Sequence, residues 1–156
     1  MEEILKNLQS KFEGDIDTTE KTLKTYSRDA SLFEIKPQVV VFPKNANDVK
    51  ELIKWVNENK NDYPSLSITP RSAGTDMSGG PLNDSVIVDF TKYMNKIIKV
   101  TEDEACAEPG CFYRDFDKET RKKNRIMPAY TASREICAIG GMVANNSGGE
   151  KSIRYG

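Results

Sequence analysis

Histidine is absent from the 156 residues of this sequence. The chain therefore supplies no histidine base, no histidine metal ligand and no histidyl link to a prosthetic group, which excludes many enzyme mechanisms. Cysteine is scarce: Cys106, Cys111 and Cys137 form no C-x-x-C pair. An odd, dispersed set of thiols favours neither a zinc site nor a disulfide framework, so we predict no metal site and a reduced, cytoplasmic setting.

Long apolar runs and an excess of one charge are also missing. No window approaches the ~20 apolar residues of a membrane helix, and the acidic N-terminus does not resemble a signal peptide. Lys+Arg (23) and Asp+Glu (24) nearly cancel, so no overall field favours nucleic acid or an anionic membrane. The basic residues 121–125 are interpreted as a charged helix end. We therefore predict a protein that is cytoplasmic or peripheral to a membrane.

Strand-like and helix-like segments alternate along the chain. Short apolar runs that end at proline, glycine or asparagine predict strands, and apolar residues at helical spacing predict helices. The order of these segments, strand–helix–strand followed by a hairpin and a helix, predicts an α+β or an α/β fold. The predicted strands are residues 38–42, 66–69, 85–90, 96–101 and 104–108, and the predicted helices are residues 2–13, 45–60 and 112–124.

The segment "PRSAGTDMSGG", residues 70–80, separates two predicted strands and contains little that can pack in a core. Its glycines accept positive φ angles, so a simple turn is one interpretation. The spacing does not fit G-x-x-x-x-G-K-[ST] or G-x-G-x-x-G. Short side chains do, however, let successive N–H groups converge on an anion, which favours a pyrophosphate held by the main chain.

Three side chains of this loop have expected roles of their own. Thr75 and Ser78 can add hydroxyl donors to an anion site. Arg71 either contributes charge or pairs with a carboxylate. A carboxylate beside an anion is unfavourable, so we expect Asp76 to point away or to cap a neighbouring N–H group.

A second loop, "AIGGMVANNSGG" at residues 138–149, contains two glycine pairs and two adjacent asparagines. Paired glycines permit the close approach of a flat ligand, and amides both donate and accept hydrogen bonds. The alternative is a helix N-terminus or a hairpin turn. With Pro109-Gly110 between them, the two loops predict the walls of one cleft for a large, planar, phosphate-bearing cofactor.

Six segments of the sequence, in this order, resemble segments of a known family. Together they resemble the N-terminal part of an FAD-binding domain of the vanillyl-alcohol-oxidase/PCMH type. Within it, the FAD-linked D-lactate/glycolate dehydrogenases are the most similar branch. The segments are "YSRDAS", "KPQVVVFPKNANDVKELIKWVNE", "PRSAGTDMSGG", "VIVDFTKYMNKI", "AEPGCFYRDF" and "SREICAIGGMVANNSGGEKSIRYG".

The resemblance implies a PCMH-type fold of two small α/β subdomains, the second incomplete in this chain. Residues 1–30 would be a helical or irregular lead-in and residues 31–156 the FAD-binding domain, divided into 31–100 and 101–156. Members of the family continue beyond the "RYG" step into a cap that carries histidines and often a metal. We therefore expect this chain to be a fragment of a longer protein.

The resemblance also implies which residues lie near FAD. Many relatives attach the flavin through a histidine where Thr75 stands here, so non-covalent binding is expected. The catalytic groups would lie outside this chain, and no catalytic residue is predicted. The expected cofactor-binding residues are Pro70, Arg71, Ser72, Ala73, Gly74, Thr75, Asp76, Ser78, Gly79, Gly110, Ser133, Gly140, Gly141, Asn145 and Gly148.

The implied function is the FAD-binding portion of an oxidoreductase. It would oxidise a 2-hydroxy acid such as D-lactate or glycolate by hydride transfer to flavin N5. Its partners would be that small-molecule substrate and an electron acceptor that the sequence does not identify, and the oligomeric state is open. The alternatives are another flavoenzyme of the superfamily, such as a sugar-alcohol oxidase or a cell-wall precursor reductase, and a non-catalytic module that binds a nucleotide or a partner.

Overall fold

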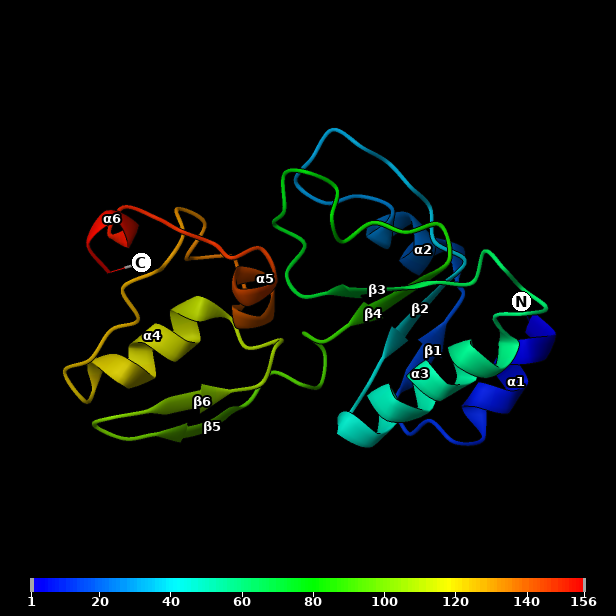
Figure 1. The fold of residues 1–156 in the computed structure, drawn as a ribbon, viewed down its shortest axis with the longest axis horizontal. Helices are drawn as coiled ribbons and strands as arrows, with labels where there is room; N and C mark the ends of the chain where they lie inside the picture. The colour runs from blue at the N-terminus through cyan, green and yellow to red at the C-terminus, as the bar shows by residue number, and fades with distance from the viewer. Residues whose placement is uncertain (1, 156) are drawn as a thin grey trace.

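The computed structural model describes residues 2–155, with the side chains of residues 5–155. Two lobes lie side by side, and the chain passes from the first to the second after β4 (Figure 1). The elements are α1 (Glu2–Gln9), β1 (Asp15–Asp17), α2 (Glu20–Tyr26), β2 (Val39–Phe42), α3 (Ala46–Asn59), β3 (Ile68–Arg71), β4 (Val86–Asp89), β5 (Ile97–Val100), β6 (Ala105–Ala107), α4 (Tyr113–Arg121), α5 (Ile139–Ala144) and α6 (Ser152–Tyr155).

A four-stranded sheet in the order β1-β2-β4-β3 forms the first lobe. β2, β4 and β3 are parallel, whereas β1 runs antiparallel to β2. Helix α3 makes the crossover from β2 to β3, as parallel strands require. The loop at residues 72–81 leaves the carboxyl end of β3, the edge at which open α/β sheets bind ligands.

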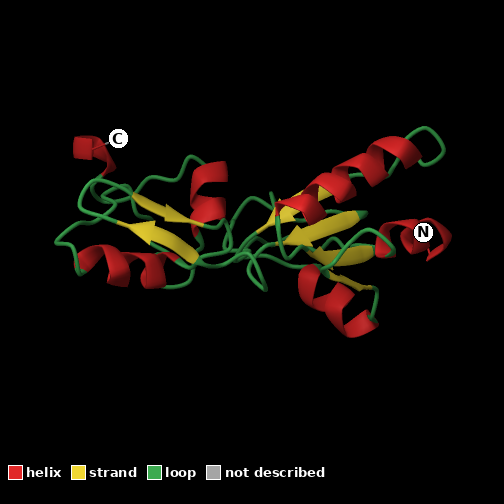
Figure 2. Ribbon diagram, turned by 90° about the horizontal axis from the view of Figure 1, so that it is seen from below, coloured by secondary structure: helices red, strands yellow, loops and turns green. Residues whose placement is uncertain are grey.

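Both faces of this sheet are buried by helices, which Figure 2 shows on its two sides. Val39 and Val41 pack in one cluster with Leu52 of α3. Val40 packs in the opposite cluster with Leu23 of α2. Because successive residues of a strand point to opposite faces, burial on both sides explains why β2 is apolar throughout.

Strand β3 is longer at its carboxyl end than the sequence predicts. The predicted strand ends at Thr69 because proline lacks an N–H group, yet β3 includes Pro70 and Arg71. β3 is an edge of the sheet, where a missing N–H costs no ladder hydrogen bond. The glycine-rich loop therefore begins at Ser72.

Two boundaries differ from those expected. Residues 15–17 of the expected lead-in form β1, whose Ile16 pairs with Val41, so the first lobe includes part of residues 1–30. The expected division at residue 100 separates β5 from β6, which are paired through Val100 and Ala105. A hairpin forms as one local unit, so the second lobe begins with β5.

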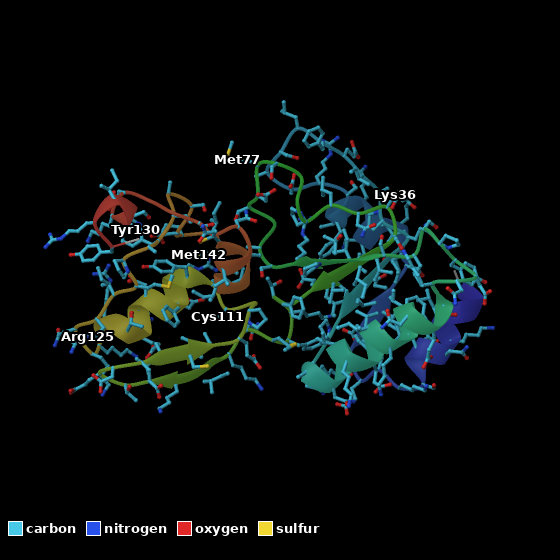
Figure 3. All side chains as sticks on the ribbon, in the orientation of Figure 1. Lys36, Met77, Cys111, Arg125, Tyr130 and Met142 are labelled. Atoms are coloured by element: carbon cyan, nitrogen blue, oxygen red, sulfur yellow. The ribbon has the colours of Figure 1, made fainter. Side chains whose placement is uncertain are left out.

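Helix α4 packs against β5, and a second core forms above it. This core contains Tyr113, Tyr130, Cys137 and Met142, with Met142 projecting from α5 toward α4 (Figure 3). The basic stretch at 121–125 follows the end of α4, where arginine and lysine side chains pair with acidic residues of the same helix. It is a charged helix end, as predicted.

Candidate functional site

The two glycine-rich loops face each other at the junction of the lobes, where α5 lies beside the loop that follows β3 (Figure 1). Residues from 70–81 and from 131–147 line one cavity of about 340 Å³. The loops thus form the two walls of a common cleft, as the sequence predicts. Ten of the expected cofactor residues line it: Pro70, Arg71, Ser72, Ala73, Gly74, Thr75, Asp76, Ser133, Gly141 and Asn145.

The other five expected residues support the walls from outside the lining. Ser78 donates its N–H and its hydroxyl to Asp76. Gly79 and Gly148 lie beside side chains on the outer sides of the loops. Gly110 donates its N–H to the Met94 carbonyl at 2.8 Å, in the connection between the lobes, and Gly140 packs against Pro109.

Six successive main-chain N–H groups of the first loop, from Ser72 to Met77, donate to no protein acceptor in the described part of the chain. Five of these residues, 72–76, are half-buried and line the cleft. Amides without partners are costly in a folded protein unless water or a ligand accepts their hydrogens. Consecutive free N–H groups form a concavity that favours an anion, here without any lysine.

Gly74 gives this loop its bend. Its φ of +67° lies in the left-handed region that side chains disfavour. A Cβ atom at this position would lie 2.4 Å from Nη2 of Arg71. The bend therefore favours glycine, and any side chain here would also displace the Arg71 guanidinium beneath it.

The Arg71 guanidinium lies under the loop. Nη2 donates to the Arg28 carbonyl at 2.8 Å, and the guanidinium stacks 5.1 Å from the centre of the Tyr26 ring. Nη1 is buried without a hydrogen-bond partner, and burial lowers the pKa of Arg71. Arg71 forms no direct ion pair with a described carboxylate, but Asp89 and Asp29 lie near enough to oppose the lowering of its pKa. The guanidinium still presents a positive charge beneath the loop, which favours an anion above it.

The Asp76 carboxylate caps its own loop, as expected. Oδ2 accepts hydrogen bonds from the N–H of Ser78 (3.0 Å), the Ser78 hydroxyl (2.7 Å) and the N–H of Gly80 (2.8 Å). These bonds, that of Ser78 Oγ foremost, lower the pKa of Asp76 to about 2. The carboxylate is therefore ionised at neutral pH, and its Oδ2 accepts donors of its own loop.

The floor of the cleft is a close contact between the lobes. The Ser72 hydroxyl donates to the Pro109 carbonyl at 3.1 Å, and the N–H of Gly140 donates to the same oxygen at 2.8 Å. A Cβ atom on Gly140 would lie 2.7 Å from that oxygen. Gly140 thus sets how closely α5 approaches the first loop.

The cleft includes residues that the sequence patterns did not single out. The hydroxyl groups of Thr131 and Ser133 lie 2.9 Å apart, and the Cys137 thiol lies 3.4 Å from Thr131. The sequence feature that could have indicated this wall is the group of small and hydroxylated residues just before the Gly140-Gly141 pair. The additional lining residues are Met77, Gly80, Pro81, Thr131, Cys137, Ala138, Met142, Ala144 and Ser147.

Membrane-spanning helices and metal-binding clusters are both missing from residues 2–155. None of the helices there has the length and apolar character needed to cross a membrane. No cluster of three or more cysteine, aspartate or glutamate residues there is arranged to hold a metal ion.

Fold and cleft together define a class: a two-lobed α+β domain that offers main-chain amides to a phosphate-bearing cofactor at the junction of its lobes. The FAD binding domain family matches residues 37–156, and the chain belongs to this family. FAD is its cofactor. The residues fit that group, because the free amides of 72–77 and the buried guanidinium beneath them suit a diphosphate.

Curated relatives agree with this assignment. The D-2-hydroxyglutarate dehydrogenase of Escherichia coli (strain K12) is 29% identical over 150 residues, which cover 95% of this chain and 14% of that protein. The glycolate oxidase subunit GlcD of Bacillus subtilis (strain 168) is 29% identical over 136 residues, covering 84% of this chain and 28% of its own length. The chain thus spans only a minor part of these relatives.

Solved structures share the fold. An alkyldihydroxyacetonephosphate synthase superposes on 100% of this chain with a TM-score of 0.83 and 22% identity, over 31% of its own length. A p-cresol methylhydroxylase covers 94% of this chain with a TM-score of 0.76 and 22% identity, over 29% of its own length. The predicted PCMH-type fold is confirmed.

Proposed function

We propose that this chain is the FAD-binding part of an oxidoreductase that acts on the CH–OH group of a 2-hydroxy acid such as D-lactate or glycolate. The cleft with six unpartnered amides between two glycine loops carries this proposal. The names of the relatives, D-2-hydroxyglutarate dehydrogenase and glycolate oxidase subunit, support the substrate class. FAD, when bound, supplies the acceptor for the substrate's hydride.

Within this proposal, the chain binds and orients the cofactor. The amides of Ser72 to Asp76 hold the diphosphate, and the buried Arg71 guanidinium adds a favourable field beneath them. Ser133, Gly141 and Asn145 form the opposite wall, beside the isoalloxazine and ribityl portion. Residues 31–156 carry both binding loops, and the lead-in completes the first sheet with β1. Proton transfer from the substrate is assigned to groups outside this chain.

We propose that binding is non-covalent, because Thr75 occupies the position at which a histidyl link is expected. The intact protein should be yellow as purified, and acid precipitation should release all of its flavin into the supernatant. Flavin that stays with the pellet would refute non-covalent binding. A colourless protein that takes up no added FAD would contradict the cofactor assignment.

The substrate class is tested on the same preparation. Under anaerobic conditions D-lactate, glycolate or D-2-hydroxyglutarate should bleach the flavin absorbance, with L-lactate as the matched control for stereochemistry. Bleaching by sugar alcohols and by none of the hydroxy acids would favour the alternative flavoenzyme.

We place the protein in the cytoplasm, with a separate electron acceptor. Its three cysteines are free thiols, Cys106 exposed and the other two buried, which suits a reducing compartment.

A further inference from the structure

We propose that Asp76 is a positioning residue for the cofactor: it closes the far half of the glycine loop and ties the loop to α5 through Asn145. This inference rests on the proposed function, since the loop it positions is the one assigned to the FAD diphosphate. The Asp76 side chain is not assigned any contact with the cofactor; only its main-chain N–H group is.

The Asp76 side chain joins two segments 69 residues apart in the sequence. Its Oδ2 accepts the three hydrogen bonds from Ser78 and Gly80, and its Oδ1 accepts one from Nδ2 of Asn145 at 2.8 Å. Its main-chain carbonyl accepts the N–H of Ala30 at 3.1 Å. Asp76 thus connects the loop to the segment that follows α2 and to the C-terminal end of α5.

These contacts divide the loop into two halves. The donors that follow Asp76, from Ser78 and Gly80, are consumed by its carboxylate, whereas the amides from Ser72 to Met77 are free of protein acceptors. The carboxylate therefore takes all four of its donors from Ser78, Gly80 and Asn145, three at Oδ2 and one at Oδ1. It uses none of the amides from Ser72 to Met77, which stay available to another acceptor.

The bond to Asn145 sets the distance between the walls. Asn145 caps the carboxyl end of α5, and its N–H donates to the Gly141 carbonyl at 3.0 Å. At the other end of α5, Gly140 is held against Pro109. The short helix is thus linked to the first lobe near both ends. At the floor the link runs through the Pro109 carbonyl, which accepts from both Gly140 and Ser72, and at the rim Asn145 bonds directly to Asp76.

Met77, at the tip of the loop, makes little apolar contact with the rest of the protein. Its side chain is 81% exposed and points away from both lobes at the tip of the loop (Figure 3). Apolar packing of Met77 therefore does not hold the tip of the loop in place. The hydrogen bonds of Asp76 fix this turn instead.

The test measures the dissociation constant of FAD for the deflavinated intact protein. Asp76→Ala removes every side-chain bond and should weaken FAD binding about 30-fold. Asn145→Ala should weaken it about tenfold, which corresponds to about 1.4 kcal/mol. The double variant Asp76→Ala/Asn145→Ala should be no weaker than Asp76→Ala, because the two side chains act through one shared hydrogen bond.

Rescue by the conservative variant separates hydrogen bonding from charge. In Asp76→Asn the carbonyl oxygen still accepts from Ser78 and Gly80, and the amide can donate to Asn145 after the latter's side-chain amide rotates. Its FAD affinity should lie within about threefold of wild type. Asp62→Ala, in the exposed turn that leads from α3 to the amino end of β3, is the matched control and should not change the affinity.

Several outcomes would overturn the positioning role. They are an Asp76→Ala affinity within twofold of wild type or tighter, additive losses in the double variant, and an Asp76→Asn loss as large as that of alanine. If Asp76→Ala does not fold, Asp76→Asn and Asn145→Ala decide the question. A wild-type protein that takes up no FAD would instead overturn the proposed function, and the positioning role with it.

Discussion

Gly74→Val should abolish FAD retention in the intact protein, weakening binding at least about 100-fold. Forcing a residue with a side chain into the left-handed region costs about 1–2 kcal/mol, and a β-branched residue there is an outlier. The new Cβ would also meet the Arg71 guanidinium, 2.4 Å away. The bend must therefore change, and the free amides would no longer converge on the diphosphate. Flavin absorbance per purified protein and FAD titration of the deflavinated protein measure the loss.

A matched pair of alanine variants separates strain from cofactor binding. Gly74→Ala and Gly79→Ala impose similar backbone strain, since both glycines have positive φ, +67° and +84°. The Cβ of the second variant would face Phe33, outside the cleft. Both should lower thermal stability, but the larger loss of FAD affinity should belong to Gly74→Ala. Equal losses of affinity would contradict a specific role of the amides beside Gly74 in binding FAD.

Gly140→Ala should separate the two walls of the cleft. Its Cβ would lie 2.7 Å from the main-chain oxygen of Pro109 and 2.9 Å from Ser72 Oγ, so α5 must move away from the first loop. Overpacking of this kind costs about 1–3 kcal/mol of stability. We expect a lower melting temperature and FAD binding weakened about tenfold or more.

The neighbouring residue provides the control. A Cβ on Gly141 would meet only Ser72 Cβ, at 3.8 Å, which is an ordinary van der Waals contact. Because alanine favours a helix over glycine by up to about 1 kcal/mol, Gly141→Ala should not lower the stability of the apoprotein. If Gly140→Ala were as stable as Gly141→Ala, the close approach at the floor of the cleft would be incorrect.

Local patterns predicted α1, α3, α4 and five of the strands, whereas the short helices α2, α5 and α6 were not among the predicted helices. β2 was recognisable because burial on both faces makes it apolar throughout, and the hairpin of β5 and β6 because its partners are adjacent in sequence. The pairing of β1 with β2 was missed. β1 has only three residues, two of them aspartates, so its sequence gives little indication of a strand. The extension of β3 through Pro70 was missed because edge position is a property of the assembled sheet.

The same distinction applies to the cleft. The sequence indicated the two glycine loops, since their lack of apolar residues is visible without a partner. The placement of Arg71 beneath Gly74, against Tyr26 and Arg28, required the fold. The hydrogen bond between Asp76 and Asn145 also required the fold, because neither local sequence predicts the other residue as its partner.

A crystal structure of the intact protein with FAD tests the central claim most directly, which is that main-chain amides of one loop hold the cofactor's diphosphate. We predict diphosphate oxygens about 2.7–3.2 Å from several of the nitrogens between Ser72 and Asp76. A diphosphate bound elsewhere, with these nitrogens facing only solvent, would contradict it.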